Sequence, residues 1–466
     1  MSRKGRFVLS ILVLVVISSG PIVAAGFGTA PVWTFEGSQS SEDLAQAVAL
    51  TDVNGDGLDD LIVGSPFRTG STPYQHTGEV LVFFGSPSGP STTPSQILVT
   101  PNQEFGHALA AVGDWNGDGF NDLAVESSFN PARVQIFLGS SLGLGSFPSW
   151  EVTGPGTFGQ GIGAAGDVNG DGFPDLLVGD YFYDNGALHH AGRAYLFFGG
   201  PGASTQPAWT YTGDQANSNL GAPLSGAGDI NGDGFADIIV SQTGWTVSQM
   251  QHNKLVQYQT GRALVFLGSA SGPAAAPDWI TVGPINSLYG SAVGSAGDVN
   301  GDGFGDVIVG DNQADVALKG GGPNHPTGDN RGMAFVYLGS SVGLATTPSW
   351  TVTGDDDGAF LGDAVASGDI NNDGFSDVIV TAPLRTSPGV QQGRIYAYLG
   401  SSSGLATTAS WFIDGGQAGA GGAGLPLATG KVNGDSRTDL LVGVPSWDGA
   451  AGVNTGRAEF YVADSN

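Results

Sequence analysis

The sequence contains no cysteine and few basic residues, and these two absences exclude several kinds of protein. Without cysteine the chain forms no disulfide bonds and carries no thiol chemistry. Its 15 Lys and Arg residues stand against 43 Asp and Glu residues, which gives a formal net charge of −28. Nucleic-acid binding needs a basic face. We therefore expect no nucleic-acid partner.

Long hydrophobic runs are also scarce, and the clearest one lies near the N-terminus. Residues 8–18 read VLSILVLVVIS, after three basic residues and before the small residues Val23 and Ala25. This order is typical of a secretory signal peptide, so residues 1–25 are predicted to be removed on export. The alternative is an uncleaved membrane anchor, for which the run is short. We expect a secreted, extracellular or cell-surface protein with no membrane span after cleavage.

A nine-residue phrase occurs seven times and decides the fold. The copies begin at residues 52, 114, 167, 229, 298, 369 and 431, and the third reads DVNGDGFPD. Each copy follows a run of small residues and precedes an apolar run, a glycine-led run and a last run that usually contains Trp. Four short extended runs per unit indicate one antiparallel four-stranded blade. Seven such units predict an all-β, seven-bladed β-propeller over residues 31–466.

The composition of the runs fits their places in such a ring. We name the strands A to D from the centre outwards. Strand A is rich in small residues because seven copies crowd around one axis. Strand D carries one Trp per repeat, which is most simply explained by packing between blades. These residues are Trp150, Trp209, Trp279, Trp350 and Trp411.

The two ends of the repeat region are incomplete in complementary ways. The last unit stops after its strand C, near residues 456–462, and residues 31–37 (PVWTFEG) form a strand D without a unit of its own. We therefore predict that these two segments pair and close the ring, which leaves no free sheet edge between them.

The repeated phrase has the composition of a calcium-binding loop. Positions 1, 3, 5 and 9 are Asp, Asn, Asp and Asp, position 7 can add a backbone carbonyl, and position 6 is Gly. Hard oxygen donors in a flexible loop favour Ca²⁺. An EF-hand is excluded because position 12 is Val in every copy, where that motif has a ligating Glu. About half of the acidic residues lie in these phrases, whereas a generally acidic surface would spread them more evenly.

We predict about six calcium sites, each in a loop that joins strands A and B. The predicted ligands are Asp52, Asn54, Asp56, Leu58 and Asp60; Asp114, Asn116, Asp118, Phe120 and Asp122; Asp167, Asn169, Asp171, Phe173 and Asp175; Asp229, Asn231, Asp233, Phe235 and Asp237; Asp298, Asn300, Asp302, Phe304 and Asp306; and Asp369, Asn371, Asp373, Phe375 and Asp377.

The seventh copy departs from the phrase. Lys431 replaces the first Asp and Ser436 replaces the turn glycine. An ammonium group at the first ligand position repels a cation, so this loop is predicted to be empty of calcium. Either the Lys charge takes the place of the cation, or the loop has lost its function.

Together the repeats resemble FG-GAP repeats, the units of the integrin α-subunit propeller. The first half of the motif appears as Phe105-Gly106 and Phe158-Gly159, and in softened form at residues 220–221, 289–290 and 361–362. The second half appears as GSP at 64–66, TAP at 381–383 and GVP at 443–445. The resemblance covers residues 31–466. It implies calcium in the repeated loops and ligand recognition on the opposite face of the ring.

Two long insertions lie on that opposite face, at residues 241–261 and 311–332. Loops on a rigid scaffold often carry binding sites. We predict contacts with an extracellular protein or carbohydrate through Trp245, His252, Tyr258, His325 and Arg331; tolerated decoration is the alternative.

Two functions remain open. One is a monomeric, calcium-binding adhesion or ligand-binding module, and the other is an extracellular polysaccharide lyase or hydrolase. The acidic run at residues 355–357 is either a further cation or ligand contact or a solvated turn. No catalytic motif stands out, which favours binding over catalysis, and no catalytic residue is assigned.

Overall fold

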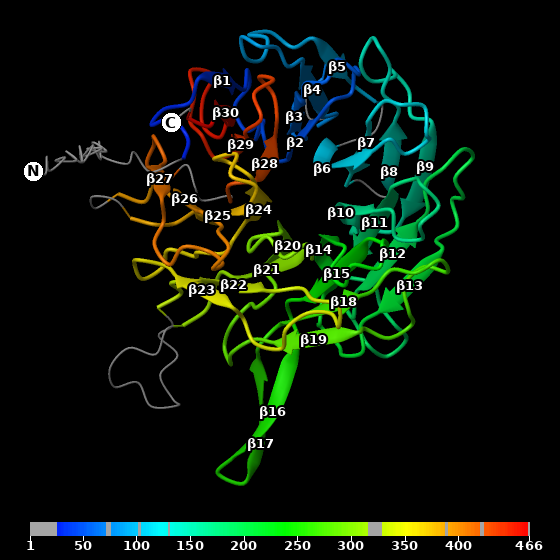
Figure 1. The fold of residues 1–466 in the computed structure, drawn as a ribbon, viewed down its shortest axis with the longest axis vertical. Helices are drawn as coiled ribbons and strands as arrows, with labels where there is room; N and C mark the ends of the chain where they lie inside the picture. Colours follow the sequence, from blue (N-terminus) through cyan, green and yellow to red (C-terminus); the bar gives the residue numbers. More distant parts are fainter. Residues whose placement is uncertain are drawn as a thin grey trace, which may run out of the picture.

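The computed structural model describes residues 26–70, 76–100, 104–128, 131–315, 329–386, 390–419 and 424–464. The predicted signal peptide, residues 1–25, lies outside the described residues. Seven four-stranded antiparallel sheets surround a common centre (Figure 1). The prediction of an all-β, seven-bladed propeller is confirmed. The described residues contain no helix with the length and apolar character needed to cross a membrane.

Each blade runs from an inner strand A to an outer strand D. The first three blades are β2 (Val48–Thr51), β3 (Asp60–Ser65), β4 (Glu79–Phe83) and β5 (Gln96–Leu98); β6 (Phe105–Gly113), β7 (Asp122–Ser127), β8 (Ala132–Phe137) and β9 (Trp150–Gly154); and β10 (Phe158–Gly166), β11 (Asp175–Asp180), β12 (Arg193–Phe197) and β13 (Trp209–Thr212). The next two are β14 (Leu220–Gly228), β15 (Asp237–Gln242), β18 (Arg262–Phe266) and β19 (Trp279–Val282); and β20 (Ala292–Gly297), β21 (Asp306–Asp311), β22 (Met333–Tyr337) and β23 (Trp350–Thr353). The sixth blade is β24 (Val365–Gly368), β25 (Asp377–Ala382), β26 (Arg394–Tyr398) and β27 (Trp411–Asp414), and the seventh is β28 (Leu427–Gly430), β29 (Asp439–Val444), β30 (Arg457–Tyr461) and β1 (Trp33–Glu36).

Burial explains the composition of the strands. All residues of each strand B, such as β11, are buried because neighbouring blades cover both faces of the sheet. A strand buried on both faces reads as a continuous apolar run. The inner strands contact one another around the ring, and small residues permit that approach. A methyl group on Gly64 of β3 would lie 2.1 Å from the carbonyl oxygen of Gly106 in the next blade. Only glycine fits where the two blades meet at this point.

The predicted closure of the ring is confirmed. Strand β1 pairs with β30 in antiparallel register, from Trp33 opposite Phe460 to Glu36 opposite Arg457. The two strands lie side by side in Figure 1. The N-terminal strand is therefore strand D of the blade that contains the C-terminal strand.

The Trp residues of strand D link successive blades, as predicted. The indole N–H of Trp150, Trp209, Trp279 and Trp350 each donates to a backbone carbonyl in the C–D turn of the next blade, at 2.8 to 3.3 Å. Trp411 is the exception, because the next blade has the chain ends where this turn would be. Its indole nitrogen is buried without a hydrogen-bond partner, and Phe27 packs edge-on against its ring at 5.1 Å.

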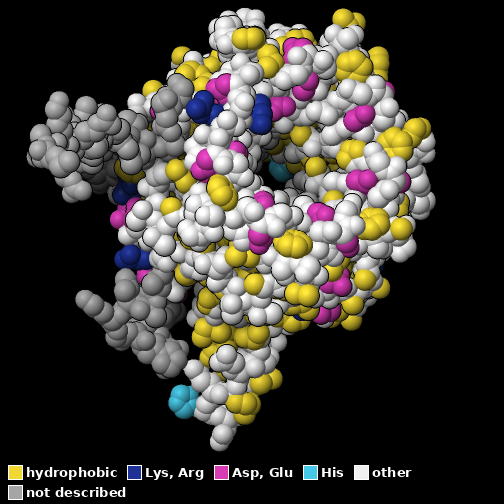
Figure 2. All heavy atoms as spheres, in the orientation of Figure 1, with side chains coloured by type: hydrophobic (Ala, Val, Ile, Leu, Met, Phe, Trp, Pro, Cys, Tyr) yellow, Lys and Arg dark blue, Asp and Glu magenta, His cyan; other side chains and the backbone are white. Residues whose placement is uncertain are grey.

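One element extends beyond the ring. Within the insertion at residues 241–261, β16 (Thr246–Gln251) and β17 (Lys254–Gln259) form a two-stranded hairpin. It projects from the fourth blade between β15 and β18 (Figure 1). No acidic residue lies between 243 and 261, and Figure 2 shows no Asp or Glu side chain on the projection, while magenta side chains are spread over the ring. Much of the second insertion, residues 316–328, lies outside the described residues.

Candidate metal centre

The seven repeated loops all join strand A to strand B, so they emerge on one face of the ring. We call this the calcium-loop face, and we call the face of the B–C and D–A connections the ligand face. Successive connections of an antiparallel blade alternate between the two faces. The geometry therefore places the loops at the opposite end of the strands from the β16–β17 hairpin.

Hydrogen bonds within each of the six regular loops curl the loop around its first Asp. In the third copy the carboxylate of Asp167 accepts the backbone N–H groups of Asp171 at 3.1 Å and Gly172 at 2.8 Å. The side-chain oxygens of Asn169 and Asp171 each accept the N–H two residues further on. Short side chains of this kind stabilise tight turns through their own backbone. The same two bonds to the first Asp occur in all six regular loops, at 2.7 to 3.2 Å.

The Asp at position 9 has a different environment from the other three side chains. Asp175 is buried, and its carboxylate accepts the backbone N–H of Val168 at 2.9 Å and of Gly199 at 2.9 Å. Gly199 follows strand C of the same blade, so this carboxylate ties the loop to the C–D turn. Equivalent pairs of bonds occur at the other six copies of position 9.

Negative charge is held close together in each loop. Burial raises the pKa of Asp175 to about 7, and the carboxylates of Asp171 and Asp167 add to the rise, whereas the two N–H donors oppose it. The pKa of Asp60, Asp122 and Asp377 is raised to about 7 in the same way, and that of Asp237 and Asp306 to about 6. A cation beside these carboxylates would favour their ionised form.

The donor chemistry of the loops fits calcium. Each regular loop offers three carboxylates, one amide oxygen and backbone carbonyls, and hard oxygen donors are the ligands that Ca²⁺ selects. A carboxylate oxygen that accepts one N–H keeps a further lone pair for a cation. Among the described residues, no group of three or more His, Asp or Glu side chains is already gathered closely enough to hold a metal ion. Calcium ligation by these loops therefore stays a prediction.

The seventh loop differs in structure as well as in sequence. Asn433 and Asp435 keep the local turn bonds to residues 435 and 437. Lys431 supplies no carboxylate at position 1, and its backbone N–H donates to Asp59 of the first blade at 2.6 Å. The contact links the last inner loop to the first one at the closure of the ring.

Position 9 is expected to contribute to stability without calcium. We predict that Asp175→Ala lowers the free energy of unfolding in EGTA by about 2–6 kcal/mol, because the buried N–H of Val168 and the partly buried N–H of Gly199 lose their acceptor at about 1–3 kcal/mol each. Asp171→Ala, at an exposed position of the same loop, should have little effect in EGTA and should reduce only the stabilisation gained on adding calcium. Denaturant titrations of both variants with and without calcium measure this difference. Equal effects of both substitutions in EGTA would contradict the assignment.

Comparison with known proteins places these repeats in a family. The FG-GAP repeat pattern matches residues 44–83, 224–266 and 361–398, and the FG-GAP-like repeat pattern matches residues 114–178. The chain contains FG-GAP repeats. The four matched segments lie in blades one, two to three, four and six, so the family signal is spread around the ring.

Relatives of this FG-GAP protein include integrin α subunits. It is 38% identical to integrin alpha-IIb of Mus musculus over 176 residues, which cover 34% of this chain and 17% of the integrin. It is 34% identical to integrin alpha-5 of Xenopus laevis over 182 residues, which cover 35% of this chain and 17% of that protein. The chain thus spans about a sixth of the length of these relatives. A chain in the crystal structure of BBS1N in complex with ARL6DN has the same fold, with a TM-score of 0.50 and 10% identity over 94% of this chain and 97% of the other.

The predicted ligand residues of the FG-GAP protein fall into two groups. Trp245, His252 and Tyr258 lie on the β16–β17 hairpin or at its base. His252 is exposed at the hairpin tip, and Tyr258 is half-buried opposite Val247. Arg331 lies in the next blade, and His325 lies outside the described residues. The structure therefore brings three of the five residues together on one element.

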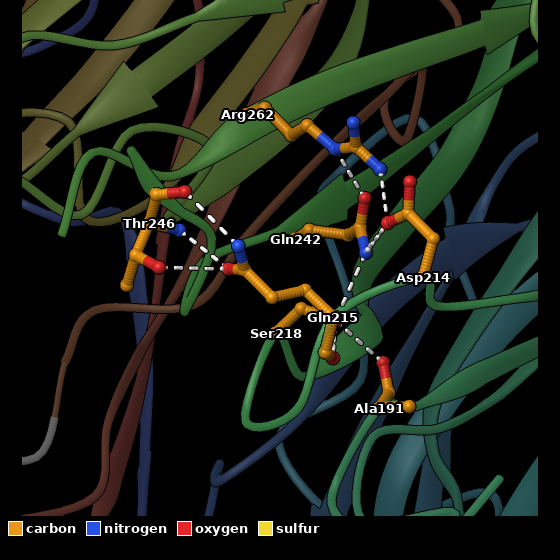
Figure 3. A network of polar contacts seen from close by, with 7 residues as sticks. All are labelled: Ala191, Asp214, Gln215, Ser218, Gln242, Thr246 and Arg262. Carbon is orange, nitrogen blue, oxygen red and sulfur yellow. Dashed lines mark hydrogen bonds and ion pairs between the residues drawn. The ribbon is translucent and has the colours of Figure 1, made fainter. Parts of the chain in front are cut away.

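The base of the hairpin is held by a polar network (Figure 3). The buried Arg262 donates from Nε to Gln242 and from Nη2 to Asp214 at 2.6 Å. Its guanidinium group lies 3.5 Å from the centre of the Trp245 ring. Gln215 accepts the N–H of Thr246 at 2.7 Å and donates to its carbonyl at 3.1 Å. Trp245 thus anchors the hairpin, so its removal would affect stability as well as any binding.

Arg331 belongs to a separate cluster around the acidic run at residues 355–357. Its guanidinium group lies 2.7 Å from Asp357, and Asp355 accepts the hydroxyl of Tyr396 at 2.7 Å. Arg385 lies within 3.6 Å of Asp355 and Asp356. Arginines of the chain itself therefore balance this acidic run.

The sequence analysis predicted position 9 only as a calcium ligand and missed that its carboxylate joins the loop to the C–D turn. The available signal was the glycine that follows strand C in six of the seven units, at residues 85, 139, 199, 268, 339 and 400. Its N–H meets the position-9 carboxylate, and a methyl group on Gly199 would lie 2.3 Å from the carbonyl oxygen of Pro174. A glycine conserved within the repeat thus marks a close approach between the loop and the C–D turn.

Proposed function

We propose that this protein is a secreted, calcium-binding adhesion or ligand-binding module that recognises an extracellular protein or glycan through its ligand face. The observation that carries the proposal is the β16–β17 hairpin, which projects from a rigid blade and is fixed at its base by Arg262 and Gln215. A pre-oriented element loses little conformational entropy on binding. The similarity to integrin α subunits supports an adhesion or ligand-binding role at the level of the family.

The tip of the hairpin has the surface of a contact element. Met250 and Leu255 face each other across the two strands, and 68% and 67% of their surfaces are exposed. His252 and Lys254 lie beside them, in a segment that has no acidic residue. An apolar tip with a small positive charge differs from the acidic ring around it. Secretion follows from the predicted signal peptide at residues 1–25.

A second candidate, polysaccharide cleavage, is favoured by one group of side chains on the ligand face. Nδ1 of His107 lies 3.4 Å from the fully buried carboxylate of Glu126, which also accepts the hydroxyl of Ser128 at 2.9 Å. Burial alone would lower the pKa of His107, but Glu126 raises it above its ordinary value. A carboxylate behind a histidine is a common arrangement in general acid–base catalysis.

An array of glycans and matrix proteins, probed with the protein from residue 26 onwards, tests the proposal. Retention of one class of ligand without cleavage supports the binding module. Shortening of acidic polysaccharides in a parallel incubation, lost in His107→Ala, would support the enzyme. Absence of both would contradict the proposed function.

The two faces should respond differently to substitution. We predict that Asp167→Ala weakens calcium binding and lowers the melting temperature, but leaves affinity for the array ligand nearly unchanged. The double variant Met250→Ser and Leu255→Ser should do the reverse, because both side chains are exposed and support no core. Ligand titrations and melting curves of both variants measure this, at a temperature where each is folded. Loss of binding in folded Asp167→Ala, with normal binding in the hairpin variant, would show that the binding face is wrongly assigned.

A further inference from the structure

Three pockets open on the calcium-loop face, each in the seam between two neighbouring blades. Their volumes are about 320 Å³ between blades two and three, 210 Å³ between blades four and five, and 240 Å³ between blades five and six. We call them the seam pockets. Each lies between the strand D Trp of one blade and the C–D turn of the next. They occupy equivalent places around the ring.

The linings of the seam pockets are alike. One wall carries the indole of Trp150, Trp279 or Trp350 and the leucine directly after strand C of the same blade, which is Leu138, Leu267 or Leu338. Polar groups lie beside this apolar wall. They are the calcium-loop residues Asn116 and Asn300 in two pockets, and Ser149, Asp278 or Ser349 directly before the Trp. No Lys, Arg or His lines any of the three pockets.

Two other seams, which follow blades one and three, are filled by a larger side chain after strand C. Where the open seams have Leu after strand C, blade one has Phe84 and blade three has Phe198. A methyl group on Gly143 would lie 2.8 Å from Cζ of Phe84, and one on Gly272 would lie 3.0 Å from Cζ of Phe198. The equivalent glycines of two open seams, Gly343 and Gly404, have no such neighbour within 4 Å. In these five seams, the open ones have Leu after strand C and the filled ones have Phe.

We propose that each seam pocket binds one neutral sugar ring, so that the calcium-loop face carries three glycan-binding sites. An indole and a leucine suit the apolar face of a pyranose, and the hydroxyls of Ser149 and Ser349 or the carboxylate of Asp278 can hydrogen-bond to its hydroxyls. Sites for drug-sized ligands measure roughly 300–1,000 Å³, so pockets near or below the lower limit fit a single ring. The absence of a cationic lining residue and the net charge of −28 disfavour acidic sugars.

The proposal goes beyond the ligand-face function, because the seam pockets lie at the other end of the strands from the hairpin. Three like sites on one face would act together on a surface that displays many copies of a glycan. Linked sites can raise the overall affinity by about 10²–10⁴ over a single site. Weak binding at each seam pocket is therefore compatible with firm attachment of the whole propeller to such a surface.

Calorimetric titration and soaked crystals with methyl glycosides of neutral hexoses and N-acetylhexosamines test the proposal. We expect one of these glycosides to occupy three sites per chain. Leu338→Phe should fill one pocket and reduce the number to two, as Phe198 does naturally. Phe198→Leu should open a seam that already has Trp209 and raise the number to four.

The first blade offers a matched control. Phe84→Leu opens a seam in which Gln96 stands where the others have Trp, so the number should remain three if the indole is required. Leu267→Phe replaces Leu338→Phe if the latter lowers the melting temperature. Failure of every glycoside to bind would overturn the proposal. An unchanged number of bound glycosides per chain in folded Leu338→Phe, Leu267→Phe and Phe198→Leu variants would also overturn it. The hairpin variant should retain all three sites, which separates this result from the ligand-face function.

Discussion

A protein that lacks residues 26–37 should lose most of its stability. The deletion removes strand β1 and exposes the edge of β30 along its whole length. It also removes Phe27 and Trp33, which are 1% and 7% exposed. Truncation of a buried aromatic side chain costs about 3–5 kcal/mol, so the loss is about 6–10 kcal/mol. Whole domains are stable by only about 5–15 kcal/mol. Thermal melting followed by circular dichroism measures the loss.

Two point variants and a peptide keep this test decisive if the deletion does not fold. Trp33→Ala should cost about 3–5 kcal/mol. Val32→Ala, one residue earlier and 62% exposed, should stay within about 0.5 kcal/mol of the parent. A synthetic peptide of residues 26–37 should restore part of the melting temperature of the deleted protein. An unchanged melting curve after the deletion would mean that the β1–β30 pairing does not close the ring in solution.

Chelation of calcium is expected to have the second-largest effect. Extracellular calcium sites commonly bind with a Kd of about 10⁻⁴–10⁻³ M. At roughly ten times Kd each independent site contributes about 1.4 kcal/mol, so six sites would contribute about 8 kcal/mol. EGTA should therefore lower the melting temperature far more than any single Asp→Ala substitution in a loop. Metal analysis should approach six calcium ions per chain, with the loop at Lys431 empty.

The seventh loop provides the control for the number of sites. The double variant Lys431→Asp and Ser436→Gly restores the regular phrase and should add one calcium ion and further stabilisation by calcium. Seven ions in the unmodified protein would contradict the argument from the Lys charge. Two or three ions would mean that a matching phrase does not ensure occupancy.

The repeated architecture was predictable from sequence because each blade obeys the same local rules. Small residues mark strand A, a continuous apolar run marks strand B, and a Trp marks strand D. The closure was predictable because the last unit lacks a strand D and Trp33 belongs to a strand D without a unit. A single short strand is a weak pattern, but the same pattern at the same place in several units is a strong one.

Features that depend on long-range contacts were not predictable in the same way. From the sequence, the hairpin could be predicted only as a long insertion. The structure shows that His252 and Asn253 have positive φ, at 49° and 61°, as a tight two-residue hairpin turn requires. The contact of Trp245 with Arg262 depends on the polar network that holds Arg262 in place. Whether a seam is open or filled depends on the size of the residue after strand C, which is Phe198 in blade three and Leu338 in blade five. A pattern of apolar and polar residues does not distinguish the two.

The pairing of β1 with β30 also sets the order in which the molecule can be completed. The two strands lie at opposite ends of the chain, at residues 33–36 and 457–461. At a synthesis rate of about 5–20 residues per second, β1 waits roughly 20–80 s before its partner exists. During this time Trp33 and Phe35 can pack only against blade one, where each ring lies 4.9 Å from Phe83, and the edge of β1 is free to pair with another nascent chain. Strand β1 is therefore translated long before the strand with which it pairs, so its edge stays unpaired until β30 has been synthesised.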